Sequence, residues 1–188
     1  MTLTTLIIIV LFVLVLLCGV YVISTYNKFI KMKNDCDEAF STMDVYLKKR
    51  YDLIPNIIET VKGYASHEKE TLENVIKARD MAQGASQLDE KIAGENAISS
   101  SLKSLFAVAE AYPDLKANTN FLDLQNQLKV VEDDIANSRK FYNGVVKTFN
   151  TKTQTFPSNL IAGMFKFTGR PLYEVDNEVE RQNVKVSF

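Results

Sequence analysis

The chain opens with a continuous apolar run and then changes to a helical repeat of apolar and polar residues. The run from Leu3 to Ile23 is 21 residues long and carries no charged side chain. At about 1.5 Å of rise per residue, a helix of this length spans roughly 31 Å, the thickness of the hydrocarbon core of a bilayer. A helix also satisfies its own backbone hydrogen bonds in lipid. We therefore expect residues 1–25 to form a transmembrane anchor.

The flanks of this run indicate that the anchor is retained and predict its orientation. A signal peptide would begin with basic residues and end at a small-residue cleavage motif, and Leu17 before Cys18 is too large for lipoprotein processing. No Lys or Arg precedes the run, whereas three lysines follow it closely: Lys28, Lys31 and Lys33. The positive-inside rule therefore predicts a single-pass protein of the inner (plasma) membrane, with its N-terminus outside and its helical domain in the cytoplasm.

After the anchor, apolar residues recur at steps of three and four, which is typical of one buried face of a helix. The first of them are Phe29, Met32, Cys36, Ala39, Met43 and Leu47. Because no turn signal intervenes, we predict that the anchor runs directly into a long first helix. Pro55 cannot donate a hydrogen bond to the carbonyl of Tyr51, so the helix is either kinked or ended there. The apolar phase continues past Pro55, which favours a kink and a helix that ends near Gln83 and Gly84.

Two further helices and a tail complete the expected fold. The second helix covers about 88–111, and the third begins near Asn118 and ends before Phe156. The third has a coiled-coil-like apolar seam that comprises Phe121, Leu124, Leu128, Val131, Ile135, Tyr142, Val145 and Phe149. A short apolar piece follows at 159–167, and the alternating pattern of 184–188 is compatible with one strand.

These elements predict an all-α protein. The expected architecture is an antiparallel helical bundle of three to four long helices, whose first helix continues the anchor, with a short irregular or strand-like C-terminal tail. The expected divisions are a transmembrane anchor at 1–25, a helical bundle domain at 26–170 and the tail at 171–188.

Composition narrows the functional class. The 22 basic and 23 acidic residues are interspersed, so no basic field exists for nucleic acid and we expect no nucleic-acid partner. Two cysteines, one of them in the anchor, argue against a disulfide framework. His67 is the only histidine, and Thr71 stands where a zinc-protease helix would carry its second histidine. The sequence also lacks nucleotide-binding, acyl-transfer and Cys-x-x-Cys motifs, so we expect no enzyme, no cofactor and no metal site.

One polar stripe runs beside the apolar seam of the third helix. Glu132, Arg139, Asn143 and Asn150 follow one another at steps of seven, four and seven. The favoured interpretation is ion pairing between helices that sets their register, and a binding groove is the alternative. The basic triplet Lys48-Lys49-Arg50 is interpreted as solvated.

Several motifs occur in order along nearly the whole chain. They are Tyr26-Asn27, Arg50-x-x-x-Ile54-Pro55-Asn56, Tyr112-Pro113-x-Leu115-Lys116-Ala117, Phe121-x-x-Leu124-Gln125, Glu132-x-x-Ile135-Ala136-x-x-Arg139-x-x-Tyr142-Asn143 and Phe156-Pro157-Ser158-Asn159-Leu160-Ile161-Ala162. In these motifs the chain resembles the LemA family of bacterial membrane-anchored proteins. It departs from the family pattern at Glu132-Asp133-Asp134-Ile135, where members often read Glu-Asn-Arg-Ile.

The resemblance carries its own expectations. It implies an antiparallel helical bundle behind one membrane helix and no established enzymatic activity. One relative is linked to membrane invagination in magnetosome formation, and genes of the family often neighbour membrane metalloproteases. Both links are associations and give no mechanism.

Helix lengths suggest how the protein assembles. A first helix continuous from Ser24 to Gln83 would be roughly 90 Å long, whereas the second and third would reach only about 36 and 50 Å. The membrane-proximal half of the first helix would then expose its apolar stripe, which marks an interface. The candidate oligomer interface comprises Phe29, Met32, Cys36, Phe40 and Met43. If Pro55 instead splits the helix, four similar passes close a self-sufficient bundle and return 156–167 to the membrane surface, where they could dip into the headgroups.

We therefore expect a membrane-anchored helical scaffold that self-associates into a homo-oligomer at the lipid bilayer and organises or shapes membrane or recruits partners. The alternative is a monomeric adaptor that presents a helical face to a membrane protease or another membrane partner.

Overall fold

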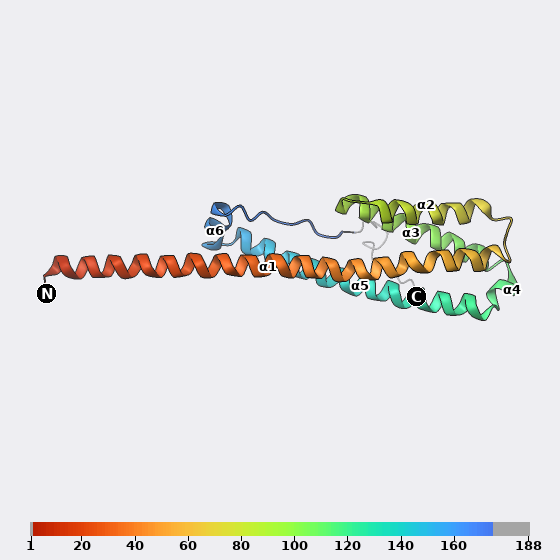
Figure 1. The fold of residues 1–188 in the computed structure, drawn as a ribbon, viewed down its shortest axis with the longest axis horizontal. Coiled ribbons are helices and arrows are strands. Elements are labelled where there is room, and N and C mark those ends of the chain that lie inside the picture. Colours follow the sequence, from red (N-terminus) through yellow and green to blue (C-terminus); the bar gives the residue numbers. More distant parts are fainter. Residues whose placement is uncertain (1, 175–188) are drawn as a thin grey trace, which may run out of the picture. The chain divides into compact units, whose positions relative to one another are not determined.

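The computed structural model describes residues 2–174, and within them the chain is helical and contains no strand. The helices are α1 (Leu3–Lys62), α2 (Lys69–Gly84), α3 (Leu88–Ala109), α4 (Pro113–Lys116), α5 (Thr119–Gln154) and α6 (Ser158–Met164), as Figure 1 shows. The prediction of an all-α protein is confirmed. The strand predicted at 184–188 lies outside the described residues.

Helix α1 joins the apolar run to the rest of the chain without interruption, as predicted. By length and composition it can cross a membrane, and Leu3 to Ile23 are almost entirely exposed. Pro55 lies inside α1 and does not end it. Because Pro55 has no N–H, the carbonyl of Tyr51 loses its helical partner. Nε of Arg79 on α2 donates a hydrogen bond to this carbonyl at 3.0 Å, which satisfies it.

The prediction that the first helix reaches Gln83 is wrong. Helix α1 ends at Lys62, and in the turn that follows the N–H groups of Tyr64 and Ala65 both donate to the carbonyl of Val61. Helix α2 then begins at Lys69. Ala65 has no exposed surface. Ala65 therefore keeps the helical spacing of buried apolar residues even though it lies in the turn. For this reason the spacing alone does not show that the helix ends at Lys62.

Packing groups the described residues into two compact units, and each contains parts of α1 and α5. Unit 1 comprises residues 2–42 and 140–172, and unit 2 comprises residues 43–139 and 173–174. The expected divisions at 25/26 and 170/171 follow chain order, whereas these units group segments that are distant in sequence.

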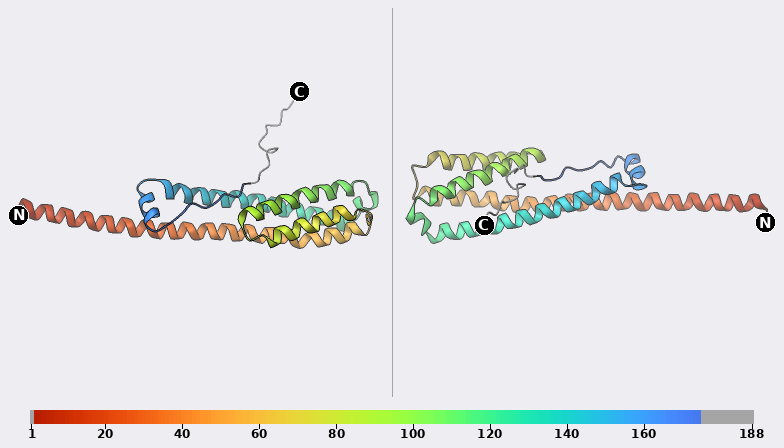
Figure 2. Two further views of the ribbon diagram at one scale, coloured as in Figure 1. Left: turned by 90° about the horizontal axis from the view of Figure 1, so that it is seen from above. Right: turned by 180° about the vertical axis from the view of Figure 1, so that it is seen from behind.

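Unit 2 contains four helical segments that lie side by side (Figure 2). They are residues 43–62 of α1, all of α2 and α3, and residues 119–139 of α5. Helices α2 and α3 are in close contact at Gly94. A Cβ atom added to Gly94 would lie 2.5 Å from Cα of Ala82, so only glycine permits this contact.

Replacing Gly94 with alanine is expected to lower the free energy of unfolding by about 1–3 kcal/mol, because the new methyl group would force the backbones of α2 and α3 apart. Urea unfolding of the detergent-solubilised protein, followed by circular dichroism, measures the change. Gly144→Ala is the matched control, since nothing lies within 4 Å of its added Cβ. Gly144 lies inside α5, so this control should gain about 0.5–1 kcal/mol. Equal effects at the two positions would contradict the close contact.

Unit 1 contains residues 3–42 of α1, residues 140–154 of α5, and α6 with the segment that follows it. The ring of Phe29 stacks on Phe167, with centroids 4.9 Å apart, and meets the edge of Phe149 at 6.1 Å. Phe40 packs against Tyr142, with centroids 5.7 Å apart. The later part of the chain therefore covers the apolar stripe of α1 that follows the apolar run.

The expectation that the candidate oligomer interface faces water is wrong for three of its five residues. Phe29, Cys36 and Met43 have no exposed surface within the single chain. Met32 and Phe40 are half-buried. On α5, the predicted seam residues Phe121, Leu128, Val131, Ile135, Tyr142 and Phe149 are buried, and Leu124 and Val145 are half-buried.

Candidate functional site

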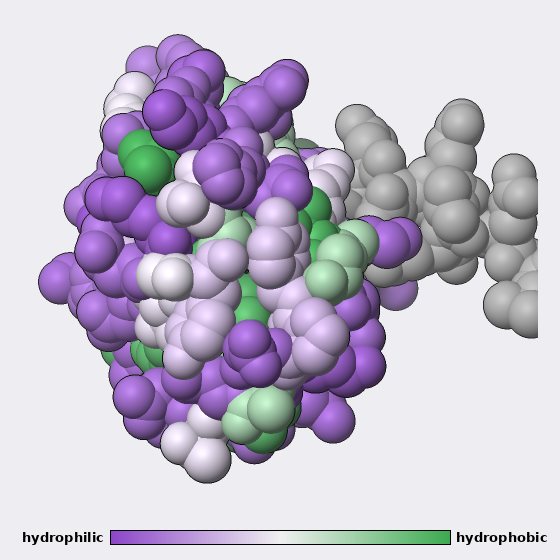
Figure 3. Space-filling view, turned by 90° about the vertical axis from the view of Figure 1, so that its right-hand side faces the viewer, coloured by the Kyte–Doolittle hydropathy of each residue, from purple (hydrophilic) through white to green (hydrophobic). Residues whose placement is uncertain are grey.

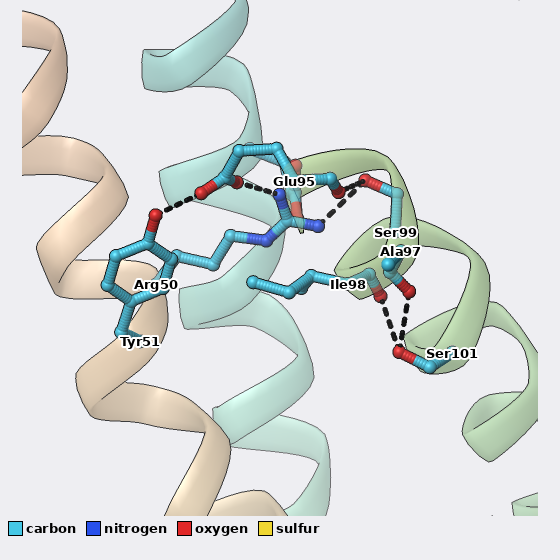
Figure 4. Close-up of polar contacts among 8 residues, drawn as sticks. Arg50, Tyr51, Glu95, Ala97, Ile98, Ser99 and Ser101 are labelled. Atoms are coloured by element: carbon cyan, nitrogen blue, oxygen red, sulfur yellow. Dashed lines mark hydrogen bonds and ion pairs between the residues drawn. The ribbon is translucent and has the colours of Figure 1, made fainter. Parts of the chain in front are cut away.

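A buried charge cluster in unit 2 centres on Arg50 of α1, whose side chain is 1% exposed. Its Nη1 donates to Oε2 of Glu95 at 2.8 Å, and its Nη2 donates to Oγ of Ser99 at 2.8 Å (Figure 4). Both partners belong to α3. Nε of Arg50 lies 2.9 Å from Oε1 of Glu132 on α5, an ion pair without hydrogen-bond geometry. One guanidinium therefore ties three helices together.

Tyr51 extends the cluster. Its hydroxyl donates to Oε1 of Glu95, so both oxygens of this carboxylate are engaged. Burial raises the pKa of Tyr51 well above its usual range, and the bond to Glu95 raises it further. Burial also raises the pKa of Glu132, against the opposing attraction of Arg50. Burial therefore favours the neutral forms of Tyr51 and Glu132, and the attraction of Arg50 opposes this effect at Glu132.

Tyr173 and Arg139 lie beside the same cluster. The guanidinium carbon of Arg139 lies 4.9 Å from the ring centroid of Tyr173, a cation–π contact. Tyr173 is 1% exposed, and burial raises its pKa to about 12. The polar stripe residue Arg139 is therefore packed against a tyrosine that follows α6 in the chain.

Raising the pH above 10 is expected to destabilise unit 2 through Tyr173. The pKa of Tyr173 is higher in the folded chain than in the unfolded one. Its contribution to the free energy of unfolding is therefore complete below about pH 10 and is lost as the pH rises toward 12. Between pH 8 and pH 11 the wild type should lose roughly 1 kcal/mol more unfolding free energy than Tyr173→Phe. Urea titrations of both proteins at the two pH values measure this difference, and parallel losses would contradict it.

Arg50 and Glu95 are the residues of this cluster whose burial is not expected from the sequence. The solvated interpretation of the Lys48-Lys49-Arg50 triplet is wrong for Arg50. A signal is nevertheless present, because Arg50 continues the buried steps of Leu47 and Ile54, and Glu95 falls between the apolar positions Ile92 and Ile98. Two opposite charges at seam positions of different helices point to a buried pair.

The polar stripe is distributed over both units. Glu132 pairs with Arg50 in unit 2. In unit 1, Asn150 exchanges two hydrogen bonds with the backbone of Arg170, each 2.8 Å long. Asn143 is half-buried. Glu132 thus forms an ion pair between helices, whereas Asn150 binds the backbone of the segment after α6.

A surface groove lies in unit 1 between α1 and α5. It encloses about 330 Å³ and is lined by Met32, Asp35, Glu38, Thr42, Phe141, Val145 and Thr148. Phe141 is 61% exposed, so the groove presents apolar surface together with two carboxylates. The groove contains one predicted interface residue, Met32.

Within residues 2–174, no group of three or more His, Cys, Asp or Glu side chains is placed to hold a metal ion. His67 is exposed, and its neighbour Glu68 accepts a hydrogen bond from the hydroxyl of Tyr112 at 3.1 Å. The residues at this position therefore hold the α1–α2 turn against the end of α3.

Comparison with known proteins adds a family and two kinds of relative. The LemA family matches residues 39–188. "Protein LemA" of Metamycoplasma hominis is 26% identical over 165 residues, which cover 86% of this chain and 74% of that protein. "Magnetosome protein MamQ 2" of Paramagnetospirillum magneticum is 24% identical over 163 residues, which cover 73% of this chain and 60% of that protein. The MamQ protein of Magnetospirillum gryphiswaldense is 21% identical over the same shares.

Proposed function

Because this chain belongs to the LemA family and begins with a helix able to cross a membrane, we propose that it is a membrane-anchored helical scaffold that binds another polypeptide at the bilayer. The observation that carries the proposal is the groove of unit 1. Met32, its first lining residue on α1, lies nine residues beyond Ile23, about 14 Å along the helix. A segment bound there would therefore be held close to the membrane.

The groove's chemistry indicates the kind of partner. Met32, Phe141 and Val145 supply apolar surface, and Asp35 and Glu38 supply negative charge. An amphipathic helix with basic residues beside its apolar face complements this combination. We therefore favour the adaptor role, in which the protein presents a helical face to a membrane protease or another membrane partner. The protein is then oriented with its N-terminus outside and the partner on the cytoplasmic side of the inner membrane, as the lysine bias predicts.

Self-association is the second candidate function. The burial of Phe29, Cys36 and Met43 removes the stripe on which a homo-oligomer was expected. The groove nevertheless leaves Phe141 exposed, and copies anchored in one plane meet at high effective concentration. Such a scaffold would organise or shape membrane through contacts between its own subunits.

Photo-crosslinking in membranes distinguishes these functions. Benzoylphenylalanine in place of Phe141 lies on the groove, whereas the same residue in place of exposed Lys147 on α5 lies outside it. We expect a crosslink from position 141 to a different polypeptide that is absent at position 147. A product of twice the subunit mass would support self-association instead. If position 141 gives no product beyond the control, the groove is not a binding site and the proposal fails.

A further inference from the structure

Helix α6 has an apolar outer face that the chain leaves uncovered. Its inner residues Ile161 and Ala162 are buried. Phe156 in the preceding turn is 75% exposed, Leu160 is 60% exposed and Met164 is 68% exposed. Leu160 and Met164 are spaced by four within α6, so they share one side of the helix. In contrast, the end of unit 2 that carries α4 presents a mostly hydrophilic surface with scattered apolar residues (Figure 3).

Aromatic contacts place this segment next to the membrane end of α1. The ring of Tyr26 lies 4.8 Å from that of Phe165 and 5.7 Å from that of Phe167, measured between centroids. Tyr26 lies three residues beyond Ile23, so it is about 4.5 Å along the helix from the last residue of the apolar run. The interfacial layer on each side of a bilayer adds about 5–7 Å to the hydrocarbon core. Phe165 therefore lies at the level of the lipid headgroups.

The segment is fixed in this position by contacts on both sides. At its start, Oγ of buried Ser158 donates to the carbonyls of Lys152 and Thr155 at 2.7 and 2.8 Å. At its end, Phe167 stacks on Phe29, and Arg170 pairs with Asp37 at 2.6 Å. These contacts therefore hold α6 in place with its apolar face exposed.

The charge of unit 1 is strongly unequal. It contains eight Lys and Arg residues and three Asp and Glu residues, although the whole chain carries a net charge of −1. No acidic residue occurs in 1–34 or in 135–173. Lys28 and Lys31 beside the anchor are exposed, and so is Lys166 at the end of α6. Lys28 and Lys166 thus follow, in sequence, the contacting residues Tyr26 and Phe165, and unit 1 combines apolar surface with positive charge as segments that bind anionic membranes do.

Lys166 also adopts a backbone conformation that favours glycine. Its φ is 59°, and its N–H donates to the carbonyl of Gly163 while that of Phe167 donates to the carbonyl of Ala162. This is the Schellman arrangement at a helix end, in which glycine is usual at the position that Lys166 occupies. A lysine there is held at a conformational cost, which points to a use for its side chain.

We propose that the segment from Phe156 to Phe167 is a second membrane contact, whose apolar face enters the headgroup region of the bilayer that holds the anchor and whose basic surroundings favour anionic lipid. The proposal rests on the anchor that the proposed function also uses, and not on the groove. Phe156, Leu160 and Met164 enter the lipid, and Lys166 extends its charge toward phosphate. The contact fixes unit 1 against the membrane surface.

Depth-dependent quenching in proteoliposomes tests the proposal on the full chain. An environment-sensitive fluorophore is attached at Leu160→Cys, at Met164→Cys or at the control Phe141→Cys, in vesicles of phosphatidylcholine and phosphatidylglycerol. Cys18 is replaced by alanine, whereas Cys36 is retained because it is buried and burial raises its pKa. Phe141 is exposed in unit 1 and follows Lys140, near the level of Phe40 rather than of Tyr26.

We expect headgroup-nitroxide lipid to quench the labels at 160 and 164 and to leave the label at 141 unquenched. Equal quenching at the three positions would overturn the proposal. Labels at 160 and 164 that are shielded from water but not quenched by nitroxide lipid would assign the face to a second copy, which also overturns it. Extraction of the protein by alkaline carbonate would overturn the anchor, and with it both the contact and the proposed function.

Lys166→Gly separates a membrane role from a structural one. Glycine removes the conformational cost, so the variant should unfold at a higher urea concentration than the wild type. The ratio of inserted to free α6 on anionic vesicles should nevertheless fall about fivefold, the change that about 1 kcal/mol per lysine corresponds to. Lys147→Ala is the control for loss of one charge from unit 1 and should leave insertion unchanged. If Lys166→Gly stabilises the fold but leaves the insertion of α6 unchanged, Lys166 has no role in binding the membrane.

Discussion

Replacing Arg50 with methionine is expected to lower the free energy of unfolding by about 3–5 kcal/mol, because Glu95 would keep a buried charge without its partner. Glu95 on α3 is 2% exposed, so it has little contact with water that could replace the guanidinium. Ser99 and Glu132 lose a partner at the same time. Urea unfolding of the full chain in detergent, followed by the circular dichroism of its helices, measures the loss.

The neighbouring Lys48→Met is the matched control. The side chain of Lys48 is 74% exposed and its ion pair with Asp52, at 3.8 Å, is exposed as well, so its replacement should change stability by less than about 0.5 kcal/mol. Adding Glu95→Gln to Arg50→Met should recover part of the loss, since the uncompensated charge is then removed. Similar results for Arg50→Met and Lys48→Met would show that the cluster does not hold the helices together.

Replacing Phe29 with alanine should lower the free energy of unfolding by about 3–5 kcal/mol, because it leaves a cavity at a buried position of unit 1. Phe29 has no exposed surface and contacts the rings of Phe149 and Phe167. Its loss removes one of the contacts that hold the segment after α6 against α1. Hydrogen exchange measured by mass spectrometry should therefore show faster exchange in 140–172, the part of unit 1 that packs on α1.

Lys31→Ala is the control, since Lys31 is exposed on the same turn of α1. It should leave exchange in 140–172 unchanged. The result also bears on assembly, because an interface role for Phe29 makes a different prediction. If Phe29→Ala reduced the mass of a detergent-solubilised oligomer and left exchange within the subunit unaltered, Phe29 would lie between subunits, and the internal packing described here would be wrong.

Only part of the buried charge cluster can be predicted from the sequence. Their spacing beside the apolar seam of α5 predicts that Glu132 and Arg139 form ion pairs between helices, and Glu132 does pair with Arg50. Arg50 and Glu95 occupy seam positions as well, but a charged residue in a basic triplet or a polar stretch is more often solvated. Periodicity assigns a residue to a helix face and does not identify the side chain that it meets. The pairing of α1 with α3 and α5 therefore requires the tertiary structure.

The sequence by itself determines the apolar segment able to cross a membrane, the helical class and most helix ends, because these depend on local properties: uncharged length, periodicity, and turn residues such as Gly84 and Pro113. Only the tertiary structure decides that α1 ends at Lys62 and that the stripe around Phe29 is covered from within. The turn after Lys62 buries Ala65 in phase with the helix, so its local pattern resembles continued helix. What covers Phe29 depends on contacts with residues more than a hundred positions later in the chain, and no local pattern encodes them.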